Sequence, residues 1–408
     1  MEPPVANPGG SAHGASICSG SSHDRSFGLY IHWPFCRAKC PYCDFNSHVA
    51  ADIDHDRFAA AFQREMAHMA AQYGTGQPLS SLFFGGGTPS LMPPSLVAGI
   101  IETADELFGL APDVEITAEA NPTSAEADLF AGFAAAGVNR LSLGVQSLRD
   151  EGLVFLGREH SANEAIAALH KAQRQFERIS IDLIYARKDQ TMDSWLGELR
   201  EALDLDVTHM SIYQLTIEPG TIFFSRARRG DVLTMEDDHA AELFLETNRI
   251  MAEAGMPAYE VSNHARPGEE CRHNLTYWRA GNWIGVGPGA HGRMDMPEGR
   301  RGLATRRSPT AWLERVEADG HGIETVGEDG QEDAVTEALM MGLRLVEGVD
   351  MAALSDRFDQ LPRLVDLDAR DRMIHDGLLA EKAGYLRVTP AGRLVLNQIL
   401  AALLFTGS

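Results

Sequence analysis

The chain has few cysteines and few basic residues. Five cysteines among 408 residues are too few, and odd in number, for a disulfide-stabilised secreted scaffold, and they suit a reducing compartment. The 35 Lys and Arg residues face 58 Asp and Glu, which leaves a formal charge of −23. Binding to nucleic-acid phosphates or to anionic membranes depends on Lys and Arg, so this balance argues against both kinds of partner.

Long apolar runs are also missing. No stretch reaches the ~18–20 apolar residues that a transmembrane helix requires. Residues 1–26 lack the charged-then-apolar pattern of a secretion signal, and their richness in Pro, Gly, Ser and Ala predicts a disordered leader. We therefore expect a cytoplasmic protein with no transmembrane segment and no nucleic-acid partner. A homodimer is left open.

What is present is an ordinary globular composition, 44% hydrophobic and 23% charged, in a chain long enough to bury a core. Strand-like and helix-like segments alternate from Phe27 to about Leu215. The expected strands are 29–33, 81–84, 114–119, 140–146, 179–185 and 208–215. Strands and helices that alternate in this way predict a parallel α/β sheet with right-handed crossovers.

Three of these strands, 114–119, 140–146 and 179–185, carry polar residues on one face. Parallel strands covered by helices on both faces are apolar almost throughout. A polar face instead favours a barrel whose lumen holds a ligand near the carboxyl ends of the strands. One solvated sheet edge would explain one such strand, but not three.

The C-terminal part of the sequence is predicted to form a separate domain. Helical patterns near Gln331 and over 350–358, 364–375 and 391–404 surround a hairpin over 377–388, which is typical of a small winged-helix-like domain. We expect a leader at 1–26, a core barrel at 27–220, an extension at 221–330 and this domain at 331–408. The acidic charge favours an interaction or lid role for the last domain over DNA binding.

Cys36, Cys40 and Cys43 lie on one loop after the first expected strand. A structural zinc site normally has four ligands, so zinc would need a histidine in addition. Iron–sulfur cubanes are held by cysteine thiolates, commonly four, and three would leave one iron open for a substrate. The spacing favours an iron–sulfur cluster over zinc and over chance proximity.

This Cys-x3-Cys-x2-Cys spacing, with Tyr42 before the third cysteine, resembles the signature of radical S-adenosylmethionine (SAM) proteins. The surrounding sequence resembles the oxygen-independent coproporphyrinogen III oxidase family in particular. The segments that carry the resemblance are 30–36, 40–46, 84–90, 119–122, 144–147, 157–158 and 182–185. The resemblance covers most of the chain and implies a partial (β/α)6 barrel with the cluster at its open top.

The resemblance also implies site residues. Cys36, Cys40 and Cys43 would hold a [4Fe–4S] cluster, and SAM would chelate its open iron. Glycines at 85–87 would let backbone amides approach SAM. The residues expected around SAM are Tyr30, Tyr42, Gly86, Gly87, Thr88, Glu119, Gln146, Arg158 and Asp182. Any one of these carboxylates alone would be interpreted as part of a surface salt bridge, but Glu119 and Asp182 also lie on the polar strand faces.

One position departs from the decarboxylating members of the family. These carry a further cysteine two residues after the third cluster ligand, where this chain has Phe45. Asp44 followed by Phe45 resembles the haem-chaperone branch, which binds haem and is not expected to decarboxylate coproporphyrinogen. No catalytic residue is assigned, and whether SAM is cleaved stays open.

The segment from His273 to Trp278, His-Asn-Leu-Thr-Tyr-Trp, resembles the haem-binding motif of that branch. Imidazole is a common axial ligand of haem iron, and aromatic rings can stack on the macrocycle. From the residues alone, such a histidine could equally cap a loop, and Cys271 is a rival ligand. With the resemblance, we expect haem at His273, Tyr277 and Trp278, with His273 on the iron.

The sequence thus predicts a haem chaperone that holds a SAM-ligated [4Fe–4S] cluster and delivers haem to haem-dependent respiratory proteins. The alternative is an oxygen-independent coproporphyrinogen III oxidase that makes protoporphyrinogen IX with SAM. A winged-helix regulator that senses iron or redox state is a third and weaker hypothesis. Phe45 and His273 separate the first two hypotheses.

Overall fold

The computed structural model describes residues 26–50, 52–328, 331–358 and 364–404. The leader expected at 1–26 therefore lies, apart from Ser26, outside the described residues. Within the described ranges, no helix is both long and apolar enough to cross a bilayer.

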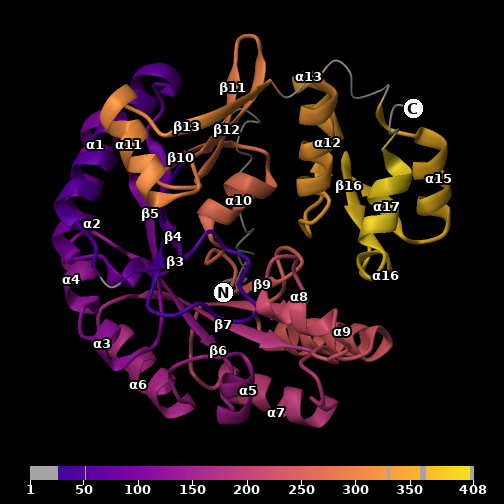
Figure 1. The fold of residues 1–408 in the computed structure, drawn as a ribbon. Helices are drawn as coiled ribbons and strands as arrows, with labels where there is room; N and C mark the ends of the chain where they lie inside the picture. The colour runs from indigo at the N-terminus through magenta and orange to yellow at the C-terminus, as the bar shows by residue number, and fades with distance from the viewer. Residues whose placement is uncertain (1–25, 51, 329–330, 359–363, 405–408) are drawn as a thin grey trace, which may run out of the picture.

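A curved sheet of eleven strands forms the body of the molecule (Figure 1), in the order β13-β12-β11-β10-β1-β4-β5-β6-β7-β8-β9. Its strands are β1 (Phe27–Trp33), β4 (Leu79–Gly86), β5 (Leu110–Ala120), β6 (Arg140–Gln146), β7 (Arg178–Tyr185), β8 (His209–Gln214), β9 (Asn263–Ala265), β10 (Asn282–Val286), β11 (His291–Met296), β12 (Gly299–Thr305) and β13 (Ile323–Glu328). The neighbours from β10 through β1 and β4 to β8 pair in parallel, and the outer strands pair antiparallel. The parallel strands are the six expected from the sequence, together with β10.

Helices cover the outer face of this sheet (Figure 1). They include α1 (His55–Tyr73), α2 (Pro94–Phe108), α3 (Ser124–Ala127), α4 (Phe130–Ala135), α5 (Asp150–Phe155), α6 (Ala162–Ala172), α7 (Met192–Leu203), α9 (Asp237–Glu253) and α11 (Pro309–Asp319). Helix α8 (Ile222–Ala227) instead packs against the cysteine loop, where the Phe223 amide donates to the Pro41 carbonyl oxygen. The apolar stripe of α1, from Phe58 to Met69, is buried against the strands, as its helical spacing requires. The polar strand faces point into the barrel, so the expected partial (β/α)6 barrel is confirmed.

The C-terminal domain has its own small core and a three-stranded sheet in the order β14-β16-β15. Its elements are α12 (Gln331–Gly342), β14 (Val349–Asp350), α13 (Met351–Arg357), α15 (Leu367–His375), β15 (Leu379–Lys382), β16 (Tyr385–Val388), α16 (Pro390–Arg393) and α17 (Leu396–Leu403). The single last helix expected over 391–404 was wrong: Val395 leaves helical geometry, with φ −124° and ψ 28°, and divides it into α16 and α17.

One short helix links the two parts. Helix α10 (Arg272–Trp278) contacts β1, β4 and β10 of the barrel on one side and α12 of the C-terminal domain on the other (Figure 1). Its side chain at position 273 reaches Gly28 and Ser81, which lie at the amino ends of β1 and β4. Helix α10 therefore closes the end of the barrel opposite to the cysteine loop, which follows the carboxyl end of β1.

Candidate functional site

The three cysteines lie on a loop that the fold holds at both ends. Cys36 ends β2 (Phe35–Cys36), which pairs with β3 (His48–Val49), and the Cys43 amide donates to the Cys40 carbonyl at 3.2 Å. Further along the loop, Asn46 Nδ2 donates to the carbonyl oxygens of Pro288 and Arg307, each at 2.9 Å. The three thiols are free and half-buried.

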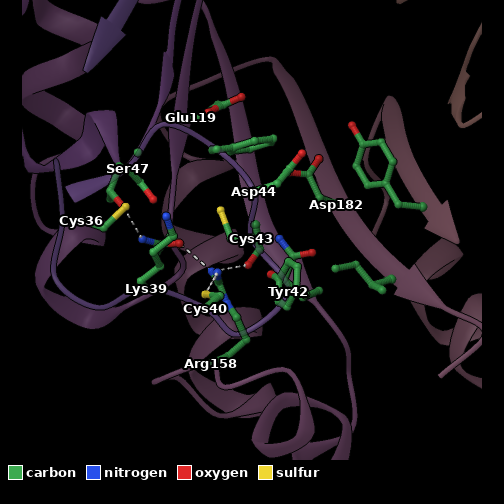
Figure 2. Close-up of a pocket in the computed structure, with 18 of the residues that line it drawn as sticks. Cys36, Lys39, Cys40, Tyr42, Cys43, Asp44, Ser47, Glu119, Arg158 and Asp182 are labelled. Carbon is green, nitrogen blue, oxygen red and sulfur yellow. Dashed lines mark hydrogen bonds between the residues drawn. The ribbon is translucent and has the colours of Figure 1, made fainter. Parts of the chain in front are cut away.

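A cavity of about 390 Å³ lies between this loop and the carboxyl ends of the strands (Figure 2). Its walls include most of the residues that the sequence predicted: Cys36, Cys40, Tyr42, Cys43, Gly87, Thr88, Glu119, Gln146, Arg158 and Asp182. Tyr30 and Gly86 are not among them. Tyr30 lies deeper in the barrel, where its ring stacks on Phe83, and the Gly86 amide donates to the Glu119 carboxylate.

A chain of hydrogen bonds connects two of the cysteines. Thr88 Oγ1 donates to Cys36 Sγ at 3.3 Å and accepts from Asn121 Nδ2 at 3.2 Å. Arg158 donates from Nη2 to Asn121 Oδ1 at 2.5 Å and from Nη1 to Cys40 Sγ at 3.3 Å. Such bonds become charge-assisted when the sulfurs are thiolates, which strengthens them. The sequence did not predict Asn121 as a site residue, although Asn121 lies within 119–122, one of the segments that carry the family resemblance.

Two carboxylates face the cavity from alternate strands. Burial, followed by the nearby charge of Asp182, raises the pKa of Glu119 to about 8. Burial also raises the pKa of Asp182 to about 6, against the opposing effects of Ser211 and Arg140. Both shifts disfavour ionisation of the two carboxylates, and a cationic group beside them would offset this effect. The cavity therefore favours a ligand with a cationic group.

The backbone around the cavity is held in unusual geometry. Gln146 has φ 66°, a left-handed conformation that is costly for a residue with a side chain and that clusters at functional sites. Gly157 has φ 67°, and a Cβ there would lie 2.6 Å from Pro41 Cδ. A glycine at 157 thus lets the neighbouring Arg158 approach the cysteine loop.

These residues fit a [4Fe–4S] cluster with SAM. Among the residues that the structure describes, no three His, Cys, Asp or Glu side chains converge on the position of a single ion. A cubane does not require such convergence, because each thiolate binds a different iron. Three free thiols at one cavity supply that donor set, and the polar walls beyond them suit an amino acid on the open iron.

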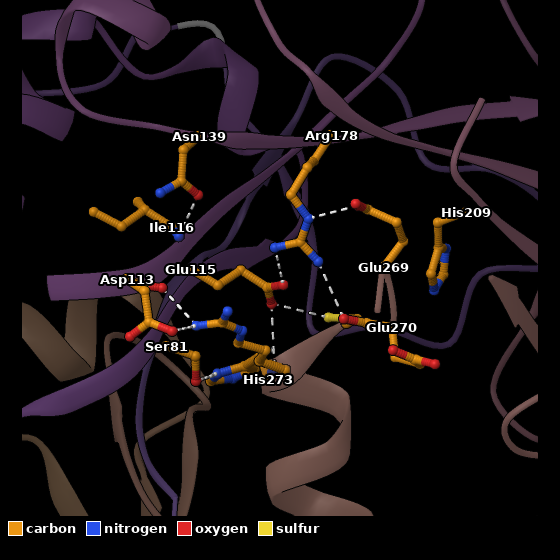
Figure 3. Close-up of polar contacts among 12 residues, drawn as sticks. Ser81, Asp113, Glu115, Ile116, Asn139, Arg178, His209, Glu269, Glu270 and His273 are labelled. Carbon is orange, nitrogen blue, oxygen red and sulfur yellow. Dashed lines mark hydrogen bonds and ion pairs between the residues drawn. The ribbon is translucent and has the colours of Figure 1, made fainter. Parts of the chain in front are cut away.

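The segment that the sequence predicts to bind haem lies elsewhere, with His273 buried beside Ser81 and Glu115 (Figure 3). His273 is only 1% exposed, and both of its ring nitrogens have partners: Nδ1 lies 2.8 Å from Ser81 Oγ, and Nε2 lies 2.5 Å from the Tyr277 hydroxyl. Burial lowers the pKa of His273 to about 3, so the ring is neutral. A neutral imidazole can bind iron, but here a ring nitrogen must first lose its partner.

Polar groups surround the backbone of this motif. The Glu115 carboxylate accepts from the His273 amide at 3.2 Å and pairs with Arg178 at 2.9 Å. Burial opposes the ionisation of Glu115, but Arg140 and Arg178 hold its pKa below the usual value. Cys271 is 1% exposed, and burial raises the pKa of its thiol to about 12. The rival haem ligand considered from the sequence is thus a buried, protonated thiol.

Comparison with known proteins gives matches over almost the whole chain. Residues 30–202 match the radical SAM superfamily, and residues 330–395 match the HemN C-terminal domain. The heme chaperone HemW of Escherichia coli is 38% identical over 91% of this chain and 96% of its own length. The HemW of Mycobacterium tuberculosis strain H37Rv is 34% identical over 93% and 95%.

Two further relatives widen the comparison. The mitochondrial radical S-adenosyl methionine domain-containing protein 1 of Bos taurus is 38% identical over 92% of this chain and 87% of its own. The structure of coproporphyrinogen III oxidase (HemN) from Escherichia coli, a radical SAM enzyme, matches with a TM-score of 0.78 at 23% identity, over 93% of this chain and 90% of that one. The α/β radical SAM fold that the sequence predicted is confirmed by this match.

Proposed function

This chain belongs to the HemW family of radical SAM proteins, and from that premise we propose that it is a haem chaperone that binds haem and delivers it to haem-dependent respiratory proteins. The observation that carries the proposal is its identity, over nearly the whole chain, with proteins named as heme chaperones. The family implies a [4Fe–4S] cluster and SAM as cofactors.

The residues that line the cavity beside the cysteine loop are suited to holding these cofactors. Cys36, Cys40 and Cys43 would bind the cluster, which when bound gives the site one-electron chemistry. Arg158 orients Cys40, and Thr88 orients Cys36, through the hydrogen bonds described above. Glu119 and Asp182, which line the same cavity, would attract the cationic amino and sulfonium groups of SAM.

Phe45 supports chaperone activity over decarboxylation. It lines the cluster cavity and is 57% exposed, at the position where the decarboxylating oxidases carry a further cysteine. A phenyl ring offers neither a thiolate nor a transferable proton. We infer that coproporphyrinogen is not decarboxylated here.

His273 is proposed as the haem-iron ligand, with Tyr277 and Trp278 beside it. The low pKa of His273 keeps its imidazole in the neutral form that binds metals. Because Ser81 and Tyr277 occupy the two ring nitrogens, haem ligation requires part of α10 to move away from the barrel end.

Two assays on one anaerobically reconstituted sample test this function. Titration with haem should give a shifted Soret band that saturates, and incubation with coproporphyrinogen III, SAM and a reductant should give no protoporphyrinogen IX. Clear decarboxylation would instead favour the oxidase hypothesis, and the absence of haem binding would remove the chaperone proposal.

A further inference from the structure

A second cavity, of about 660 Å³, lies at the end of the barrel opposite to the cysteines. It is enclosed by the amino end of β4, the loop after α9, helix α10, the loop between α12 and β14, and strand β16. Its walls therefore come from both the barrel and the C-terminal domain. Its volume falls within the ~300–1,000 Å³ that small-molecule and cofactor sites occupy.

Helix α10 separates this cavity from the interior of the barrel. Arg272, Leu275 and Arg279 line the cavity, while His273 and Thr276 are buried on the barrel side. Residues three or four apart share one face of a helix. One face of α10 therefore carries His273 and Thr276, and another face carries the residues that line the cavity. A ligand in the cavity would thus lie directly against the helix that carries His273.

Three arginines (Arg272, Arg279 and Arg387) and two carboxylates (Glu270 and Glu347) line the cavity. Arg279 pairs with Glu347 at 2.7 Å, and Arg272 pairs with Asp113 at 2.8 Å. No ion pair is recorded for Arg387 within the described part of the chain. Its guanidinium lies 5.7 Å from the centre of the Tyr385 ring, and its buried Nε has no hydrogen-bond partner. A half-buried guanidinium whose Nε has no partner among the described residues favours an anionic ligand at this wall.

Apolar side chains form another part of the wall. Leu275 of α10 and Leu345 and Val346 of the loop between α12 and β14 line the cavity, together with the ring of Tyr259. A ligand that complements this surface has a broad apolar body and carboxylate groups at an edge. Haem has this chemistry, because its macrocycle is flat and apolar and its two propionates lie on one side.

We propose that this cavity is the haem-holding site, with a propionate carboxylate paired to Arg387 and the macrocycle against Leu275 and Val346. The inference rests on the proposed chaperone function and specifies where the haem lies. It also explains how haem can be held while both nitrogens of His273 are occupied: the outer face of α10 binds first. Ligation by His273 then requires that part of α10 moves away from the barrel end, because Ser81 and Tyr277 occupy the two ring nitrogens.

Two variants and two probes test the site. Arg387→Ala removes the guanidinium, and Val346→Trp fills part of the cavity from a position that is 44% exposed. Arg249→Ala is the matched control, since the Arg249 side chain is exposed on α9 and pairs with Glu246 and Glu253. Haem and haem dimethyl ester, whose propionates are uncharged, are the probes.

Wild-type protein and the control should bind haem more tightly than the ester. Arg387→Ala should weaken haem binding about tenfold, as expected for the loss of a charge-assisted pair, and leave ester binding unchanged. Val346→Trp should weaken both. If wild type binds haem but both variants bind it equally well, this site is overturned while the proposed function stands. If wild type binds no haem, the proposed function fails, and this site with it.

Discussion

The Arg158 guanidinium donates to the Cys40 sulfur at 3.3 Å, although 118 residues separate them in the chain. The same side chain donates to Asn121 Oδ1 and to the Gly144 carbonyl oxygen. Only a planar guanidinium reaches all these acceptors together, and the compact ammonium of lysine does not. Arg158 thus joins the cysteine loop to the carboxyl ends of β5 and β6.

Replacing this guanidinium should weaken SAM binding. We expect Arg158→Lys to raise the Kd for SAM about tenfold, because Asn121 and Cys40 lose their fixed orientation. The measurement is titration of the reduced cluster with SAM, followed by electron paramagnetic resonance. Arg149→Lys, in a partly exposed pair with Glu201, is the control. An unchanged Kd in Arg158→Lys would contradict this role.

The cluster should depend on three cysteines alone. Anaerobically reconstituted protein should hold about four irons and four sulfides per chain, and Cys36→Ala, Cys40→Ala or Cys43→Ala should each abolish this content. Cys18→Ala, at a position outside the described residues, should retain it. Iron and sulfide analysis decides the matter, and loss of the cluster in the Cys18 variant would show that the ligands were assigned wrongly.

SAM affinity should increase with pH between about 6 and 8. The pKa values of Asp182 and Glu119, about 6 and about 8, are both raised, so negative charge appears in the cavity as pH rises through this range. Glu119→Gln should remove the upper part of the increase and Asp182→Asn the lower part. Anaerobic calorimetry over this range tests the assignment, and a pH profile that neither variant alters would refute it.

Releasing His273 should strengthen haem binding. In Tyr277→Phe the aromatic ring stays but the hydroxyl 2.5 Å from His273 Nε2 is lost, so the nitrogen is free to meet iron. We expect haem affinity to rise several-fold, about 1 kcal/mol for one hydrogen bond that no longer competes. His273→Ala should lose only the part of the affinity that iron ligation adds, because the outer face of α10 still holds haem. Tyr73→Phe, at the end of α1, is the control in the same Soret titration. Equal binding by all these proteins would exclude His273 as the ligand.

A buried carboxylate in the core should contribute strongly to stability. Glu65 of α1 is fully buried and accepts from the Gly287 and Gly322 amides and from Trp312 Nε1, at 2.8, 2.6 and 3.0 Å. Glu65→Ala leaves three buried donors without a partner and should cost about 3 kcal/mol or more of unfolding free energy. Denaturant unfolding of this variant beside the exposed Glu102→Ala provides the test, and equal stability would count against the network.

Local patterns predicted the barrel well because alternation and helical spacing are visible within a few residues. The strands at 140–146 and 179–185 and the buried stripe of α1 are examples. The segments that carry the family resemblance also contain most of the residues that line the cavity beside the cysteine loop. The partners of His273 could not be predicted in the same way, since Ser81 lies 192 residues away and only the closed barrel brings them together. The position of Arg387 is another case, because only the folded chain brings β16 to the cavity beside α10.

Transfer of haem to an acceptor tests the central claim most directly. Protein loaded with one equivalent of haem and freed of excess would be mixed with a haem-free b-type respiratory cytochrome, and the spectrum of the reconstituted cytochrome followed over time. The chaperone account predicts transfer from the wild-type protein and none from His273→Ala loaded under the same conditions. Retention of haem by the wild type, or equal transfer from the variant, would contradict it.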